Sequence, residues 1–151
     1  MVNCTVSGNV AGGNASGGGI VLYGSAKLDI INSTITNNSG AVNATAAGGS
    51  GINVTSTGTN ILNLYNSIVS GNKGSFGQIV GAIATRSAVV IGDQVYDYNE
   101  ALVPSAVFDD SILGPLADNG GNTQTVLLLN DANPATQYGM NLMQLQLLAI
   151  K

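Results

Sequence analysis

The stretch NSTITNN, residues 32–38, occurs in two related forms elsewhere in the chain: NCTVSGN at residues 3–9 and NSIVSGN at residues 66–72. The three copies align without gaps, although their starting points are 29 and 34 residues apart. A constant motif inside a unit of variable length is typical of a solenoid, in which the extra residues loop out on one side.

Two longer stretches precede the second and third copies and align with each other. They are GGGIVLYGSAKLDII, residues 17–31, and GSGINVTSTGTNILNLY, residues 49–65. Alternation of apolar residues at a period of two predicts β-strands in both. The apolar residues at equivalent positions are Ile20 and Ile52, Leu28 and Leu62, and Ile30 and Leu64.

Short strands joined by bends can stack coil upon coil about 4.8 Å apart, which places equivalent side chains above one another. Stacked amides then hydrogen-bond along their column, which offsets the cost of burying them. The Gly-rich stretches at 13–20 and 48–52 are expected to supply the positive φ angles of sharp corners. The motif predicts two structural ladders, an apolar one of Val6, Ile35 and Val69, and an amide one of Asn9, Asn38 and Asn72.

We therefore predict an all-β fold, a right-handed parallel β-helix of about four to five coils with a C-terminal non-repeat segment. A sandwich of antiparallel strands is the alternative. It would show hairpin turns roughly every 8 to 12 residues and no asparagines in register.

Four regions follow from the pattern. Residues 1–75 hold regular repeats, whereas residues 76–111 lose the Asn motif and suggest irregular coils and a polar loop. A closing segment spans 112–135, and an atypical tail spans 136–151. Leucine and methionine spacings of three and four predict a helix within 142–150 of this tail.

Composition excludes several classes of partner. The formal net charge is −4, and the basic residues needed to bind phosphates number only four, so nucleic acid is not expected. No apolar run approaches the ~18 residues of a membrane-spanning helix, and MVNCTVSGNV lacks the features of a signal peptide. This opening lies in mid-pattern, which suggests a fragment of a longer protein. Cys4 has no partner cysteine and is expected to be a buried thiol rather than a reactive one.

The repeats resemble those of bacterial secreted and surface β-helix proteins, including the short GG[AI]I and FxxN motifs of polymorphic outer membrane proteins. The segment ILGPLADNGGNTQTVLLLNDANPA, residues 112–135, is similar to the closing signature of the choice-of-anchor Q group. This resemblance implies an exported, non-enzymatic protein held at the envelope by a separate anchor or autotransporter module. It also implies that a last coil or strand from Leu113 to Leu129 covers the end of the core. The tail from Thr136 departs from the family pattern, and a frameshift is one hypothesis that the coding DNA would test.

Enzymes such as pectate lyases also use this fold, and their sites need clustered charges. Within the first 78 residues the charged ones are Lys27, Asp29 and Lys73, too few for several calcium-binding carboxylates with a base or for a pair of facing carboxylates. We therefore predict no catalytic, cofactor or metal-binding residues. The acidic residues of the polar excursion fit no calcium-loop spacing and are interpreted as solvated charge: Asp93, Asp97, Glu100, Asp109 and Asp110.

The same excursion holds Tyr96, Asp97 and Tyr98, a possible ligand-contact loop, because solenoids commonly place binding residues in such loops. ADNGGNT, residues 117–123, lacks the lysine of a phosphate loop and is interpreted as a turn. Asn columns beside Ser and Thr create N-glycosylation triplets automatically, so we interpret these as structural. The triplets start at Asn3, Asn14, Asn32, Asn37, Asn43 and Asn53.

These observations favour a non-catalytic stalk or passenger segment of a surface or secreted adhesin-like protein, extracellular in its full-length form. Its expected partners are a host-surface protein or a polysaccharide, and its uncapped N-terminal coil suggests end-to-end self-association. One alternative is a fragment of a polysaccharide-binding or polysaccharide-degrading β-helix whose active coils lie upstream. Another is a truncated or shifted gene product without independent function.

Overall fold

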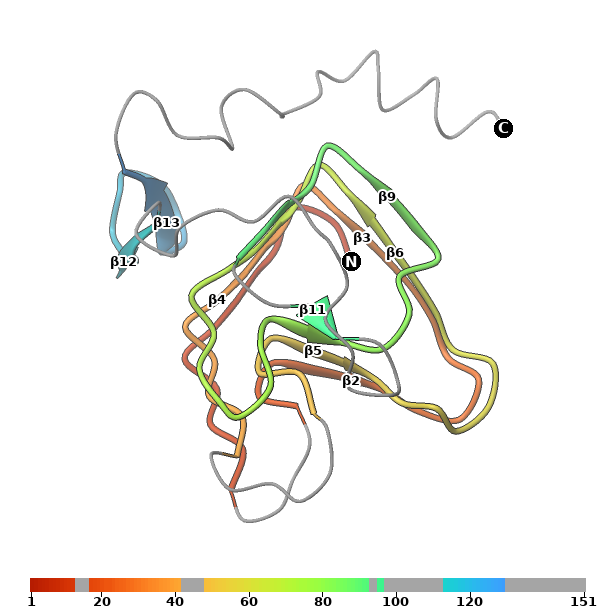
Figure 1. Ribbon diagram of the computed structural model, residues 1–151. Helices are drawn as coiled ribbons and strands as arrows, with labels where there is room; N and C mark the ends of the chain where they lie inside the picture. The colour runs from red at the N-terminus through yellow and green to blue at the C-terminus, as the bar shows by residue number, and fades with distance from the viewer. Residues whose placement is uncertain (13–16, 42–47, 93–94, 97–112, 130–151) are drawn as a thin grey trace.

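The computed structural model describes residues 1–12, 17–41, 48–92, 95–96 and 113–129. Every regular element in these ranges is a β-strand, and β1 to β11 run parallel in three stacked sheets. Viewed along the stack, the three sheets form the sides of a triangle around a common core (Figure 1). This arrangement is compatible with a parallel β-helix. Because all pairings of these strands are parallel, it excludes the antiparallel sandwich.

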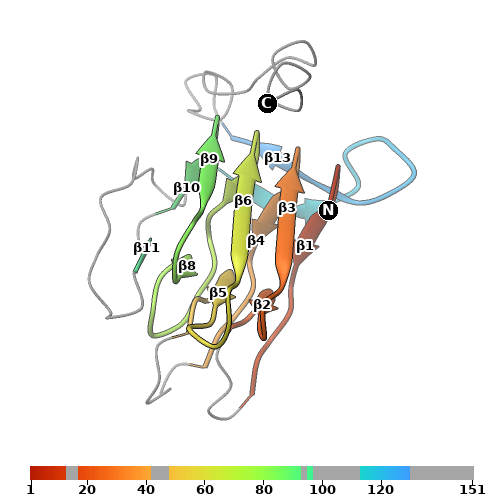
Figure 2. The ribbon, with the colours of Figure 1, turned by 90° about the vertical axis from the view of Figure 1, so that its right-hand side faces the viewer.

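Each sheet takes one strand from each successive turn of the chain. The first sheet contains β1 (Thr5–Ser7), β4 (Thr34–Thr36), β7 (Ile68–Val69) and β10 (Val90–Ile91). The second contains β2 (Ile20–Leu22), β5 (Ile52–Val54), β8 (Ile79–Val80) and β11 (Val95–Tyr96). The third contains β3 (Lys27–Ile31), β6 (Ile61–Tyr65) and β9 (Thr85–Ser87), which lie side by side in Figure 2.

The core is built from apolar rows that run across the sheets. Leu28 pairs with Leu62 and Ile30 with Leu64, the matches expected from the alternating pattern. Burying such side chains contributes roughly 1.5–3 kcal/mol each, which makes these rows the main source of stability. The buried apolar cluster comprises Leu22, Ile30, Ile35, Ile52, Val54, Leu62, Leu64, Val69, Ile79 and Ile91.

Parallel stacking continues after the Asn motif is lost. Ile68 pairs with Val90, only 22 positions later, whereas Thr34 pairs with Ile68 across 34 positions. In the second sheet, Ile79 pairs with Val95 across only 16 positions. The chain therefore shortens its connections while keeping its strands in register.

The glycines before β2 and β5 act differently from the expectation of corner residues with positive φ. Gly17 has a φ of 97°, but Gly18, Gly19, Gly49 and Gly51 do not lie in the left-handed region. Instead, a Cβ on Gly18 would lie 2.4 Å from the Ser50 carbonyl oxygen. Close approach of neighbouring coils, rather than backbone conformation, explains most of this glycine content.

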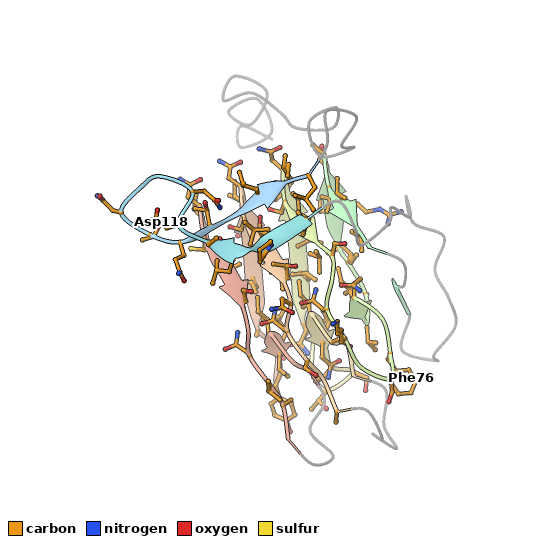
Figure 3. All side chains as sticks on the ribbon, turned by 90° about the vertical axis from the view of Figure 1, so that its left-hand side faces the viewer. Phe76 and Asp118 are labelled. Carbon is orange, nitrogen blue, oxygen red and sulfur yellow. The ribbon has the colours of Figure 1, made fainter. Side chains whose placement is uncertain are left out.

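The described part of the closing segment, residues 113–129, adds no row to the stack. β12 (Leu113–Ala117) and β13 (Thr125–Leu128) form an antiparallel hairpin of their own. ADNGGNT makes the turn of this hairpin, which includes Asp118 and lies outside the triangle alongside the first sheet (Figures 1 and 3). Its leucines stay partly exposed, Leu127 by 54%. This hairpin therefore does not form the expected last coil or strand over the core.

Several sequence-based expectations lie outside the described residues. These are the helix within 142–150, the whole tail 136–151, the contact residues Asp97 and Tyr98, and the acidic residues of the polar excursion. In the described part of the chain, no helix has the length and apolar character required to cross a bilayer.

Candidate functional site

The amide ladder occupies the corner that follows β1, β4 and β7 of the first sheet. Asn9 Nδ2 donates to Asn38 Oδ1 at 2.8 Å, and Asn38 Nδ2 donates to Asn72 Oδ1 at 2.9 Å. The same carbonyl oxygens accept the backbone N–H of the previous ladder residue, at 3.2 Å from Asn9 and 3.1 Å from Asn38. Each amide thus fixes both the side chain and the backbone of the coil before it.

The inner members of the ladder are buried with their polar atoms engaged. Asn38 is 1% exposed, and its Nδ2 also donates to the carbonyl oxygens of Val6 and Thr36, both at 3.0 Å. Asn72 Nδ2 likewise donates to the carbonyl oxygen of Ile35. Buried amides are costly unless paired, so these bonds make the ladder favourable inside the stack. The adjoining apolar row pairs Val6 with Ile35 and Ile35 with Val69.

Gln78 completes the ladder in place of a fourth asparagine. Its Oε1 accepts Asn72 Nδ2 at 2.8 Å and the Asn72 backbone N–H at 3.0 Å. Its own Nε2 turns back to the Asn72 carbonyl oxygen at 3.1 Å. Gln78 is 1% exposed. The sequence carries little signal for this role, because Gln78 lies only six residues after Asn72 and outside any repeat of the motif.

Two glycines make room for the ladder. A Cβ on Gly19 would lie 3.0 Å from Asn38 Nδ2, and one on Gly51 would lie 2.7 Å from Asn72 Nδ2. Both distances are too short for an ordinary carbon contact, so a side chain at either position would displace an amide.

A second ladder of small polar groups runs along the opposite end of the same strands. Ser33 Oγ accepts the Cys4 N–H at 3.2 Å, and Ser67 Oγ accepts the Ser33 N–H at 3.1 Å. Each serine donates to a carbonyl oxygen two residues earlier. Cys4 holds the serine position in the first coil. It is exposed, contrary to the buried thiol expected, because no coil among the described residues lies above it.

The asparagines that open the motif form a corner column in the left-handed conformation. Asn3, Asn32 and Asn66 have φ values of 52°, 49° and 46°, and Asn66 Nδ2 donates to Asn32 Oδ1 at 2.8 Å. Asparagine tolerates this conformation better than most residues. Ala88 holds the same place in the next turn with a φ of 50°. The structural interpretation of these asparagines therefore has a geometric basis, and at another of the triplets, Asn53, the side chain is buried.

A polar row crosses the outer face of the third sheet, where Asp29 pairs with Asn63 and Asn63 with Thr85. Asn63 Nδ2 donates to Asp29 Oδ1 at 2.7 Å, and Lys27 Nζ lies 3.7 Å from Asp29 Oδ2. Both charged groups are largely solvated, so this ion pair contributes little to stability. Asp29 is the sole carboxylate side chain of residues 1–92, so this part of the chain has no second carboxylate to work with it.

The described tyrosines lie on different strands or next to them. Tyr23 is 68% exposed just after β2, and Tyr65 is partly exposed at the end of β6. Tyr96 ends β11 and pairs with Val80, which places the start of the predicted contact loop at the edge of the second sheet. Among the described residues, no cluster of three or more His, Cys, Asp or Glu side chains is placed to bind a metal.

No protein-family model, no curated protein and no solved structure matches this chain.

Proposed function

We propose that this chain is a right-handed parallel β-helix of about four to five coils that serves as a non-catalytic stalk or passenger segment of a bacterial surface or secreted adhesin-like protein. The observation that carries this proposal is the continuous parallel register of three sheets whose interior holds an unbroken amide ladder. In such a stack each coil adds about 4.8 Å of length, and every coil is fixed to the next. The product is a rigid spacer that holds other elements away from their anchor.

The distribution of charge supports a structural role. The single carboxylate of residues 1–92, Asp29, is engaged by Lys27 and Asn63 on an open sheet face. Hydrolysis of glycosidic bonds ordinarily requires two carboxyl groups on either side of the bond. A display role requires no such pair, because the connecting loops supply the contacts while the stack supplies their position.

Within this proposal, Tyr96, Asp97 and Tyr98 contact the ligand, either a host-surface protein or a polysaccharide. Tyrosines combine an apolar ring with a polar tip and are enriched at protein interfaces. The backbone of Tyr96 is paired to Val80, so the loop starts from a fixed strand.

Binding to a panel of immobilised glycans and extracellular host proteins tests this role. We expect binding that falls at least tenfold when Tyr96 and Tyr98 are both replaced by Ala. Replacement of Tyr23, equally aromatic and 68% exposed after β2 at the opposite edge of the second sheet, should leave binding unchanged and is the matched control. Binding unaffected by the double substitution, or absent across the panel, would contradict the contact role.

The alternative of a polysaccharide-binding or polysaccharide-degrading fragment, whose active coils lie upstream, makes a different prediction. A cluster of carboxylates on adjacent coils in a longer coding region would favour the enzyme, because glycoside hydrolysis needs two facing carboxyl groups. Further coils as poor in acidic residues as residues 1–92, where Asp29 is the single carboxylate, would favour the stalk.

A further inference from the structure

The turn of the β12–β13 hairpin contains the single Asn-Gly pair of the chain, Asn119–Gly120. Asparagine is a thermolabile residue, because the backbone nitrogen of the next residue can attack its side-chain carbonyl carbon and close a cyclic imide. A side chain on that next residue obstructs the attack, and glycine has none. Gly120 has a φ of 84°, and a Cβ on it would meet nothing within 4 Å, so the space beside this peptide bond is open.

Hydrogen bonds place a carboxylate next to the attacking nitrogen. The Gly120 N–H donates to Asp118 Oδ1 at 3.1 Å, so its proton already faces an acceptor. Asn119 Nδ2, the group that would leave, donates across the turn to the carbonyl oxygen and Oγ1 of Thr125 at 2.8 and 3.2 Å. The turn lies clear of the three stacked sheets, with Asp118 exposed near its tip, so water reaches these atoms (Figure 3).

The inner asparagines of the amide ladder are held in a different way. The nitrogen that follows each of them is bonded to the neighbouring coil: the Ser39 N–H donates to the Asn9 carbonyl oxygen and the Lys73 N–H to the Asn38 carbonyl oxygen, both at 2.8 Å. Asn38 and Asn72 are also buried. An attacking nitrogen would have to give up its bond and turn within close-packed coils, so the stack protects these amides.

We propose that Asn119–Gly120 is a site of spontaneous covalent modification, at which the turn converts its own asparagine to aspartate or isoaspartate. The Gly120 nitrogen forms a bond to Asn119 Cγ while Asp118 takes its proton. The Cγ–Nδ2 bond then breaks, and Nδ2 leaves as ammonia with that proton. Water adds to one of the two imide carbonyl carbons, the bond from that carbon to the ring nitrogen breaks, and the ring opens. The proposal holds whether or not the chain is a stalk.

The conversion loosens the hairpin. A carboxylate accepts hydrogen bonds but donates none, so both bonds from position 119 to Thr125 are lost, and a second negative charge arises beside Asp118. Thr125 pairs with Ala117 at the turn end of two strands that form a sheet of their own. A lone two-stranded hairpin is marginally stable, so loss of this bridge opens it from the turn and leaves the stacked sheets unchanged.

Peptide mapping by mass spectrometry of the folded chain, kept at mildly alkaline pH, tests the proposal. We expect an amide-to-carboxyl mass change at Asn119, with part of the product labelled by an isoaspartyl methyltransferase, and no change at Asn38 or Asn72. Asn122 is the matched control within the same turn, because it is exposed but is followed by the branched side chain of Thr123. If Asn119 stays intact in the folded chain while the chain in urea converts it, the turn protects the pair and the proposal is wrong.

Asp118→Ala tests the proton acceptor. Conversion at Asn119 should slow about tenfold or more in the folded chain and keep the parent rate in urea, where neither chain holds the hydrogen bond. Equal rates for the two folded chains would refute this role of Asp118.

Asn119→Asp reproduces one product and tests the loosening. Hydrogen exchange at the Leu116 and Val126 amides should become about fivefold faster or more, while the amides of β6 exchange as before. Unchanged exchange in the hairpin would contradict the loosening.

Discussion

Asn38→Ala is the substitution that most directly tests whether the amide ladder holds the stack together. The Asn38 side chain makes five hydrogen bonds: it accepts from the N–H and Nδ2 of Asn9 and donates to Asn72 Oδ1 and to the carbonyl oxygens of Val6 and Thr36. Alanine removes them all. It also leaves the Val6 and Thr36 oxygens without this donor in a region that water does not reach easily.

The expected magnitude follows from these contacts. A hydrogen bond contributes about 1 kcal/mol net, and a buried group left unpaired costs about 1–3 kcal/mol. The two Nδ2 hydrogens are shared among three acceptors, so we count about four effective bonds. The free energy of unfolding should fall by about 3–5 kcal/mol, a large part of the roughly 5–15 kcal/mol typical of a domain.

Urea denaturation followed by far-UV circular dichroism measures this loss. Asn9→Ala is the matched control, because Asn9 has the same chemistry and ladder position but is exposed and loses chiefly its bond to Asn38. It should cost about 0.5–1.5 kcal/mol. An Asn38→Ala loss within about 1 kcal/mol of the control would show that the interior of the ladder contributes no more than its end, and the reasoning would be wrong.

Three further predictions concern packing, backbone and exposure. Gly51→Ala would place a Cβ 2.7 Å from Asn72 Nδ2, so we expect the free energy of unfolding to fall by about 2–3 kcal/mol. Gly12→Ala is the control: it has open space around it and should change stability by less than about 0.5 kcal/mol in the same urea assay. Ala88→Asn should raise the free energy of unfolding by about 0.5–1 kcal/mol, because asparagine tolerates its φ of 50°, and an unchanged or lower thermal midpoint would count against this. Cys4 should react with a thiol reagent in the native chain at close to the rate seen in denaturant, since it is exposed, and strong protection would contradict the structure.

The repeat region is the part of the fold that sequence predicts well. Alternation at a period of two assigns Leu28, Ile30, Leu62 and Leu64 to one face, and a slip of one residue would turn all of them to solvent. The pattern alone therefore specifies the pairs Leu28–Leu62 and Ile30–Leu64. Gapless alignment of the three motif copies specifies the register of β1, β4 and β7 in the first sheet in the same way.

Other features depend on contacts between coils, which a linear pattern does not contain. The need for glycine at Gly19 arises from the Gly51 carbonyl oxygen and the Asn38 side chain in the adjoining coil. The sequence therefore suggests a bend where the cause is crowding. Gln78 enters the ladder only because the chain shortens its connection after Asn72. The hairpin had a local signal, since Asn119-Gly120 between apolar runs is a hairpin turn sequence, but resemblance to a closing signature favoured a last coil instead.

The corner between the third and first sheets has a fixed length, unlike the other connections. Ile31 to Thr34, Tyr65 to Ile68 and Ser87 to Val90 each span three positions, although whole turns vary from 34 to 16 positions. This corner of constant length fixes which residues of the next strand face the core. An insertion elsewhere enlarges a loop, whereas one extra residue here would exchange inside for outside in the strand that follows the corner. Natural variation and engineered inserts should therefore accumulate at the other two corners, which makes them the places to graft foreign peptides.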